Sequence, residues 1–250
     1  MKKKLFLLVV ACISLLAYKN VNAKEFDSID SSFIPKDVEV TKYIKTEILY
    51  DTLTKKILET KETELTEEQY NMLDYISEPL ANCSDGAACW ETEYKKVSLR
   101  VESPVSVLTN GKVILTTTWK KVPSVKSHDI IAITFANSMK GVSASLTSSV
   151  ASNAGSKVTS EGVGISAKLS NSISANNTIV LTVSGKYSDL STWLNGKVCG
   201  TYQHAQSTVT AADSLAYSFS RGQGGVGSVL NFNSATIRDK YDQMQGVCFN

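Results

Sequence analysis

Short segments of alternating apolar and polar residues dominate the chain from residue 94 onward. Their apolar positions hold Val, Ile, Leu and aromatic residues, and Gly, Asn, Ser and Pro separate one segment from the next. Because successive side chains of a strand point to opposite faces, this alternation predicts half-buried β-strands. We expect strands at residues 96–101, 112–119, 129–135, 141–150, 162–170, 178–184, 198–203, 215–220 and 227–233. Their number and spacing predict an antiparallel β-sandwich.

The N-terminal part follows a different pattern. Residues 39–64 predict two strands around a turn at 51–55, and residues 66–76 predict a helix. Thr66 and Gln69 have the spacing of a capping box at the start of that helix. A second, short helix is expected at 235–245, with Ser234 as its N-cap. The predicted fold class is mainly β, with an antiparallel β-sandwich body and a short N-terminal α/β segment that contains one helix.

The first 23 residues have the pattern of a signal peptide. Three lysines, Lys2 to Lys4, precede an apolar run over residues 5–18 that is too short to span a bilayer, and Val21-Asn22-Ala23 resembles a cleavage site. We therefore expect a secreted, extracellular protein whose mature form starts at Lys24. The run Val9-Val10-Ala11-Cys12 leaves lipid anchoring at Cys12 as an alternative, although apolar residues continue beyond that cysteine and favour soluble secretion.

Charge divides the chain into two regions. The whole chain has 26 basic and 24 acidic residues, but four of the lysines lie in the leader, so the mature chain is slightly acidic and nucleic-acid binding is not expected. Residues 24–102 hold 10 basic and 18 acidic residues, whereas residues 103–250 hold 12 basic and 6 acidic ones. We predict a signal peptide at 1–23, an acidic segment at 24–93 that is a candidate pro-segment, and a Ser/Thr-rich β-sandwich domain at 94–250.

Four cysteines remain after the leader is removed, which suits an oxidising compartment. Three pairings are open, and we favour Cys83–Cys89 and Cys199–Cys248. The short paired spacings of a zinc site are absent, so no metal is expected. No cofactor is expected either, because the glycine motif at 222–227 precedes a strand pattern and not the helix that a dinucleotide fold needs.

Few residues suggest catalysis. Ser127, His128 and Asp129 are the residue types of a hydrolase triad, but adjacent strand residues point to opposite faces. His204 is a candidate partner for Asp129, yet the sequence has no G-x-S-x-G nucleophile turn. A secreted hydrolase is therefore the weaker reading, and a non-catalytic protein the stronger one.

Aromatic residues favour a binding function. Trp193 lies in a polar stretch and is expected to be exposed, where its ring would stack on a sugar. Tyr202, His204, Asp129 and His128 complete the predicted ligand-binding set. Trp90, Trp119, Tyr187 and Tyr217 are further candidates for such an aromatic platform, although Trp119 is expected in the core.

The segment 141–184 supports a membrane-active alternative. Apolar residues alternate with Ser and Thr on both sides of a small polar turn expected at 152–160. Such a hairpin is typical of half-buried strands, and also of the membrane-inserting hairpin of a β-pore toxin. The apolar face is weak, since Ala and Ser occupy many of its positions.

Three segments resemble a loose group of uncharacterised exported proteins of Gram-positive bacteria. They are Trp119-Lys120-Lys121-Val122-Pro123 with Ser127 to Ala132, then Gly200 to Ala205, and Asp239 to Asp242. The resemblance implies export and one body domain, and it carries no site residue over. The sequence thus predicts an extracellular module that binds carbohydrate or another cell-envelope polymer, and its basic body favours anionic polymers.

Overall fold

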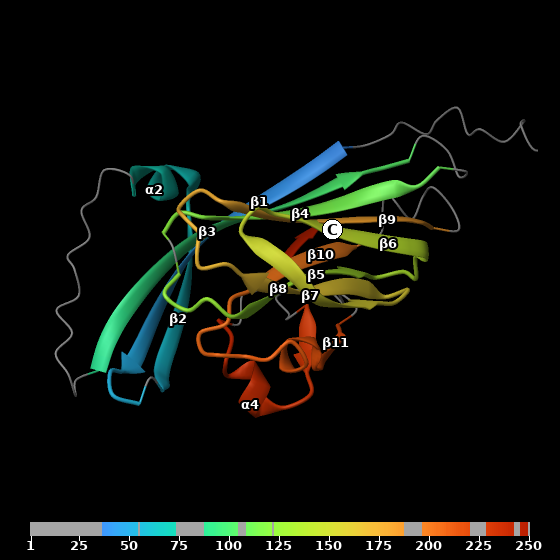
Figure 1. Ribbon diagram of the computed structural model, residues 1–250. Coiled ribbons are helices and arrows are strands. Elements are labelled where there is room, and N and C mark those ends of the chain that lie inside the picture. The colour runs from blue at the N-terminus through green and yellow to red at the C-terminus, as the bar shows by residue number, and fades with distance from the viewer. Residues whose placement is uncertain are drawn as a thin grey trace, which may run out of the picture. The chain divides into compact units, whose positions relative to one another are not determined.

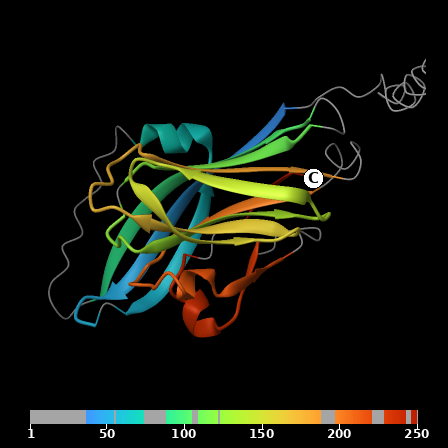
Figure 2. The same ribbon diagram turned by 45° about the vertical axis from the view of Figure 1, so that its right-hand side comes forward.

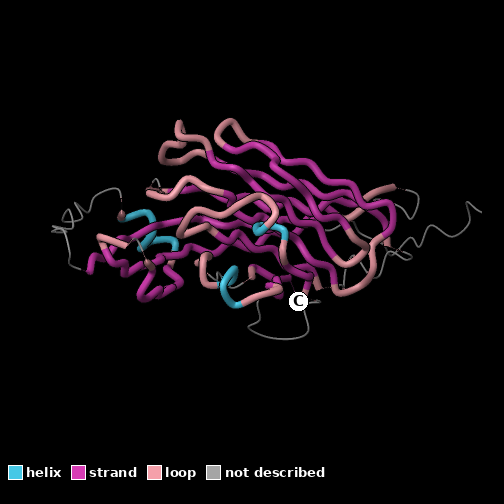
Figure 3. Tube along the Cα trace, turned by 60° about the horizontal axis from the view of Figure 1, so that its bottom comes forward, coloured by secondary structure: helices cyan, strands magenta, loops and turns pink. Residues whose placement is uncertain are grey.

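The structure is a computed structural model that describes residues 37–54, 56–73, 88–104, 109–121, 123–187, 197–220, 229–242 and 246–249. These residues belong to one compact unit, Lys36–Asn250. The expected signal peptide, Cys12 and Trp193 all lie outside the described residues. Strands dominate, and the helices are short (Figure 3).

Two antiparallel sheets form the body (Figure 1). The first has the order β2 (Ile57–Leu65), β1 (Asp37–Asp51), β3 (Ala88–Glu102), β4 (Gly111–Trp119), β9 (Thr178–Lys186) and β6 (Lys140–Thr147). The second has the order β13 (Val247–Phe249), β10 (Val198–Gln203), β5 (His128–Phe135), β8 (Gly162–Leu169) and β7 (Ala151–Val158). The predicted mainly β fold, an antiparallel β-sandwich, is confirmed.

The main core lies between the two sheets. Leu99, Leu115 and Leu181 of the first sheet share one buried cluster with Ile131 and Ile165 of the second. Along β4 and β9, buried positions alternate with less buried ones, as the period of two requires. Burial of such side chains stabilises the sandwich by about 1.5–3 kcal/mol each.

A second, smaller core covers the outer face of the five-stranded sheet. It involves η1 (Asp213–Leu215), β11 (Tyr217–Phe219), β12 (Leu230–Phe232) and α4 (Ala235–Arg238), which lie below that sheet in Figure 1. Ile130 and Ala132 of β5 cluster there with Tyr217, Leu230 and Tyr241. β5 is therefore buried on both faces.

Part of the first sheet continues beyond β4 as a three-stranded arm. We define the arm as β2, residues 43–51 of β1 and residues 88–95 of β3, which pair with one another over their length. β4 pairs with β3 only as far as Lys95, and the arm curves past the five-stranded sheet (Figures 1 and 2). The expected boundary between residues 93 and 94 falls within β3, so the acidic segment and the body share one sheet.

The predicted helices exist but are short within the described residues. Helix α2 (Glu67–Met72) has the expected capping box, with Thr66 and Gln69 bonding reciprocally. Helix α4 starts after the predicted cap Ser234 but ends at Arg238, because Tyr241 already bridges to Ala205. The expected helix over 235–245 is thus too long.

The segment 141–184 is not a simple hairpin. Strand β7 occupies most of the expected turn at 152–160, and it pairs with β8, whereas β6 pairs with β9. β6 and β7 lie at the same side of the sandwich (Figure 2) but belong to different sheets. Strand β7 was missed because it carries few apolar residues and is exposed along much of its length.

Candidate functional site

The inner face of β3 changes from apolar to charged along the strand. Val97 and Leu99 are fully buried in the main core, whereas Lys95, Glu93 and Glu91 occupy the preceding positions on the same face. Strand geometry directs all five side chains to one side of the sheet. The charged residues therefore project from the concave side of the arm, where β3 has passed β4.

The neighbouring strands of the arm add polar groups to this face. Thr46 of β1 is the register partner of Glu93 on one side and of Glu62 on the other. One step further along, Ile48 pairs with Glu91 and Thr60. The inner face of the arm is thus acidic, with isolated apolar residues.

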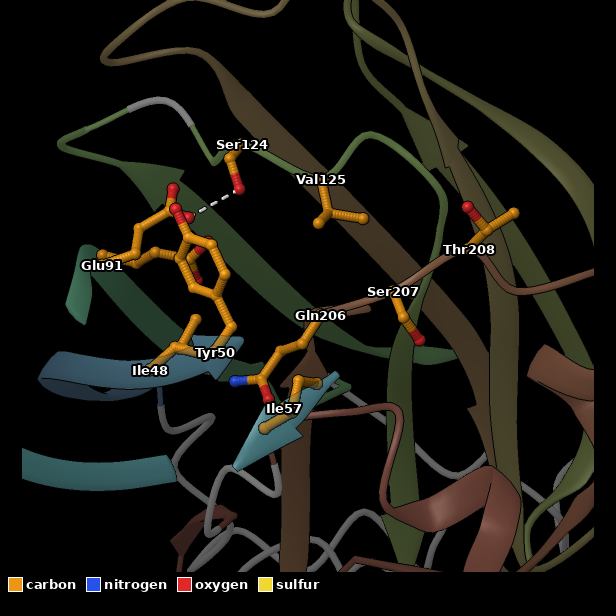
Figure 4. A pocket seen from close by; sticks show the side chains of 10 residues that line it. Ile48, Tyr50, Ile57, Glu91, Ser124, Val125, Gln206, Ser207 and Thr208 are labelled. Carbon is orange, nitrogen blue, oxygen red and sulfur yellow. Dashed lines mark hydrogen bonds between the residues drawn. The ribbon is translucent and has the colours of Figure 1, made fainter. Parts of the chain in front are cut away.

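A pocket of about 390 Å³ lies between the arm and two loops of the body (Figure 4). Tyr50, Glu91 and Glu93 line it from the arm, and Ser124 and Gln206 line it from the loops. Its remaining lining residues are Ile48, Ile57, Val125, Ser207 and Thr208. Aromatic, carboxylate, amide and hydroxyl groups therefore converge on one cavity.

Two side-chain hydrogen bonds connect the loops to the arm. The hydroxyl of Ser124 donates to Oε2 of Glu91 at 2.8 Å, and the hydroxyl of Thr60 donates to Oε1 of Gln206 at 3.0 Å. The amide nitrogen of Gln206 has no hydrogen-bond partner among the described residues. It remains available as a donor.

Glu93 is the most deeply placed carboxylate of the pocket. Its side chain is 3% exposed, and its Oε1 lies 3.3 Å from Nε2 of His204. Its other oxygen, Oε2, has no hydrogen-bond partner among the described residues. A buried carboxylate oxygen without a donor is uncommon and calls for a functional explanation.

Behind Glu93, His204 and Asp129 form a fully buried pair. Nδ1 of His204 lies 3.0 Å from both carboxylate oxygens of Asp129. Asp129 also accepts hydrogen bonds from the hydroxyl of Tyr202 and, at 2.9 Å, from the backbone N–H of Ala205. Trp119 in turn donates from Nε1 to the Tyr202 oxygen at 3.4 Å.

His204 is a cation held between two carboxylates. Burial by itself disfavours the imidazolium, but the charges of Asp129 and Glu93 outweigh this effect and raise the pKa of His204 well above its ordinary value of 6.5. Nδ1 is hydrogen-bonded to Asp129, and Nε2 lies within ion-pair distance of Glu93. The imidazolium thereby connects the pocket wall to the interior of the body.

A second buried cation lies on the same strand. Lys95, 1% exposed, forms an ion pair with Asp242, whose other oxygen accepts the backbone N–H of His204 at 3.0 Å. Burial lowers the pKa of Lys95, yet Asp242, Glu62 and Glu93 together raise it above the ordinary lysine value. Lys95 therefore stays charged.

The structure brings together three of the predicted site residues but buries them. Tyr202, His204 and Asp129 are all fully inaccessible, which corrects the expectation that they contact a ligand directly: they lie in the interior, with His204 against Glu93. His128 points elsewhere, with Nδ1 2.8 Å from the carbonyl oxygen of Val209.

The expected aromatic platform does not form from the described residues. Trp119, Tyr187, Tyr202 and Tyr217 are buried. Of the platform candidates within the described residues, Trp90 alone is substantially exposed. Aromatic residues at core positions of the strands fill the interior because their large apolar surfaces favour burial. Trp193 stays a prediction.

Sequence reasoning missed the pocket residues Tyr50, Glu91, Glu93 and Gln206, and the ion pair behind them. One signal was present: Glu91, Glu93 and Lys95 have the same strand parity as the buried Val97 and Leu99. Charged residues that continue a core-facing pattern indicate a paired or functional cluster.

Hydrolase chemistry has partial support in the geometry. The expected pairing of His204 with Asp129 is present, but Nε2 of His204 faces a carboxylate and not a nucleophilic hydroxyl. The hydroxyl of Ser127 instead donates to the backbone oxygen of Val209 at 3.1 Å.

The described residues contain no group of three or more His, Cys, Asp or Glu side chains suited to a metal ion.

A disulfide joins Cys199 of β10 to Cys248 of β13, which are direct register partners. This expected pairing is therefore found. Cys89 also takes part in a disulfide, while Cys83 lies outside the described residues. The Cys199–Cys248 bridge fixes the short C-terminal strand to the sheet.

None of the helices in the described part of the chain combines the length and apolar character needed to cross a bilayer. No known protein family matches the sequence, and no curated protein matches it significantly.

Proposed function

We propose that this chain is an exported, non-catalytic extracellular protein that binds a carbohydrate or another hydroxylated cell-envelope polymer. One observation carries the proposal: the pocket beside the arm combines the Tyr50 ring with the carboxylate of Glu91 and the amide of Gln206. Export follows from the leader pattern at 1–23, and the disulfide suits an oxidising compartment.

The chemistry of the lining supports this ligand class. Sugar rings present an apolar face, which stacks on an aromatic side chain, and hydroxyls, which need acceptors and donors. Tyr50 supplies the ring, Glu91 the acceptors, and the free amide N–H groups of Gln206 the donors. Ser207 and Thr208 add hydroxyls at the rim.

The size of the pocket suits a small unit and not a large cofactor. Ligand pockets commonly range from about 300 to 1,000 Å³, and this one, with about 390 Å³, is near the lower end. It would hold one or two units of a polymer while the remainder continues outside.

The alternatives have weaker support. For a hydrolase, the buried His204–Asp129 pair lacks an adjacent nucleophile among the described residues. If the protein were a hydrolase, replacing His204 by Ala would abolish its activity. For a membrane-active toxin, β7 offers Asn153 and Ser156 opposite the core residues Ala167 and Ile165, so the face that β7 shares with β8 is not continuously apolar, which disfavours insertion into lipid. Dye release from liposomes would support the toxin.

Co-sedimentation with purified Gram-positive cell-wall sacculi tests the proposal. We expect the secreted protein to sediment with the sacculi and Tyr50→Leu to lose about tenfold in affinity, the scale of about 1.4 kcal/mol. Tyr43→Leu is the matched control, because Tyr43 lies on the opposite face of β1 against Tyr70. Absence of the wild-type protein from the pellet, or equal binding by Tyr50→Leu, would contradict the proposal.

A further inference from the structure

We propose that the pocket recognises a positively charged amine, and specifically the free ammonium group of an amino-sugar unit, through Glu91 and Glu93. This inference rests on the proposed function of the pocket as a ligand site and names the chemistry of its ligand. It differs from the expectation of an anionic polymer, which came from the overall charge of residues 103–250.

The lining of the pocket is acidic. Among the ten lining residues, two are acidic and none is basic. A cavity walled by one sign of charge concentrates counter-charged groups from solution. An anionic ligand would be repelled by both Glu91 and Glu93, whereas an ammonium group would be attracted by both.

The cations behind the pocket already have carboxylate partners. His204 is held by Asp129 and Glu93, and Lys95 is held by Asp242 with Glu62 nearby. Four carboxylates therefore surround two cations, before Glu91 is added. With Glu91, five carboxylates accompany two cations, so the cluster has a negative excess that a ligand cation would reduce.

One buried oxygen of Glu93 lacks a hydrogen bond. Its Oε2 has no donor among the described residues, although the side chain is only 3% exposed. Leaving a buried charged oxygen without a hydrogen bond is costly. An ammonium group has three N–H donors, enough for this oxygen and for the Glu91 carboxylate together.

Tyr50 and Gln206 specify the remainder of the ligand. Tyr50 and Glu91 line the same pocket (Figure 4), so a cation bound there would also be near an aromatic ring. The buried amide nitrogen of Gln206, also without a partner, requires an acceptor such as a hydroxyl oxygen. An amine that carries neighbouring hydroxyls, as in a de-N-acetylated amino sugar, satisfies both walls.

Isothermal titration with matched oligosaccharides tests the inference on the secreted protein. The probes are a glucosamine hexamer, the fully N-acetylated hexamer of equal length, and 1,5-diaminopentane as an amine without hydroxyls. We expect the glucosamine hexamer to bind about tenfold more tightly than either of the other two. Raising the salt from about 20 mM to about 300 mM should weaken its binding, because screening reduces the attraction.

Two variants and a control locate the effect. Glu91→Gln should weaken binding of the glucosamine hexamer about tenfold, the loss of one charge-assisted contact. Glu93→Gln should weaken it at least as much, and its melting temperature shows whether the fold is retained. Glu68→Gln, on the exposed face of α2, should change nothing.

The outcomes separate this inference from the proposed function. Equal binding of both hexamers, with Tyr50→Leu still defective, would overturn the ammonium assignment and leave the polymer-binding function standing. Unchanged affinity in Glu91→Gln and folded Glu93→Gln would overturn it as well. Equal binding of 1,5-diaminopentane would overturn the amino-sugar class. Failure of every probe together with failure to bind sacculi would remove the proposed function itself.

Discussion

Replacing Lys95 by Met removes one charge from the buried network while preserving most of the side-chain volume. Lys95 is 1% exposed and its partner Asp242 is fully inaccessible, so water cannot replace the lost ammonium. Among the described residues, Asp242 would keep the backbone N–H of His204 as a hydrogen-bond donor at 3.0 Å. The buried carboxylate would then lack its ion-pair partner.

The structure sets the size of the effect. Removing one partner of a buried ion pair costs about 3–5 kcal/mol, because the remaining charge is left uncompensated. This is a large share of the roughly 5–15 kcal/mol that stabilise an ordinary domain. For a domain of this length the melting temperature should fall by about 6–20 °C.

A double variant and a surface control isolate the cause. Lys95→Met/Asp242→Asn removes the stranded charge but keeps an oxygen for His204, so it should recover at least about 2 kcal/mol of the loss. Lys42→Met breaks the pair Lys42–Glu64, whose side chains are 23% and 57% exposed, and should cost less than about 1 kcal/mol.

Urea unfolding under non-reducing conditions, followed by tryptophan fluorescence, measures these differences at constant m-value. The reasoning fails if Lys95→Met costs no more than Lys42→Met. It also fails if the double variant is as unstable as Lys95→Met, because the stranded charge of Asp242 would then not be the cause.

Three further predictions concern other parts of the fold. The raised pKa of His204 stabilises the folded state fully below about pH 6.5, and this contribution is lost as the pH rises through the pKa of His204 in the folded state. Between about pH 6 and pH 9, the unfolding free energy measured by urea titration should therefore decline more in the wild type than in His204→Gln. Opening the Cys199–Cys248 bridge, which spans 49 residues, should lower the unfolding free energy by about 4 kcal/mol in the chain-entropy treatment; a loss below about 1 kcal/mol in a Cys199→Ala/Cys248→Ala variant would contradict this. Gly164→Ala would place a methyl group against the hydroxyl of Tyr217 and 2.9 Å from its Cζ. The unfolding free energy measured by calorimetry should fall by about 1–3 kcal/mol, and adding Tyr217→Phe should relieve part of the loss.

The strands were predictable because an antiparallel sandwich writes its burial pattern into local sequence. Buried positions such as Leu115 and Leu181 alternate with partly exposed positions, several of which are threonines, and this period of two needs no knowledge of the partner strand. β7 escaped detection for the same reason: as an exposed edge strand it buries little and carries no clear alternation. The short β13 was missed too, because three residues are too few for any periodicity.

The sequence by itself determined the compartment signal, the strand periodicity, the two helix caps and the pairing of Cys199 with Cys248 as one of three options. Tertiary structure alone decided the site. Glu93 and His204 are remote in the chain, and they meet because β3 runs beyond β4 while the segment after β10 contacts the arm. Whether a histidine or carboxylate contacts solvent, a ligand or another buried charge depends on which elements pack over it, and that arrangement is set by long-range contacts that no local pattern encodes.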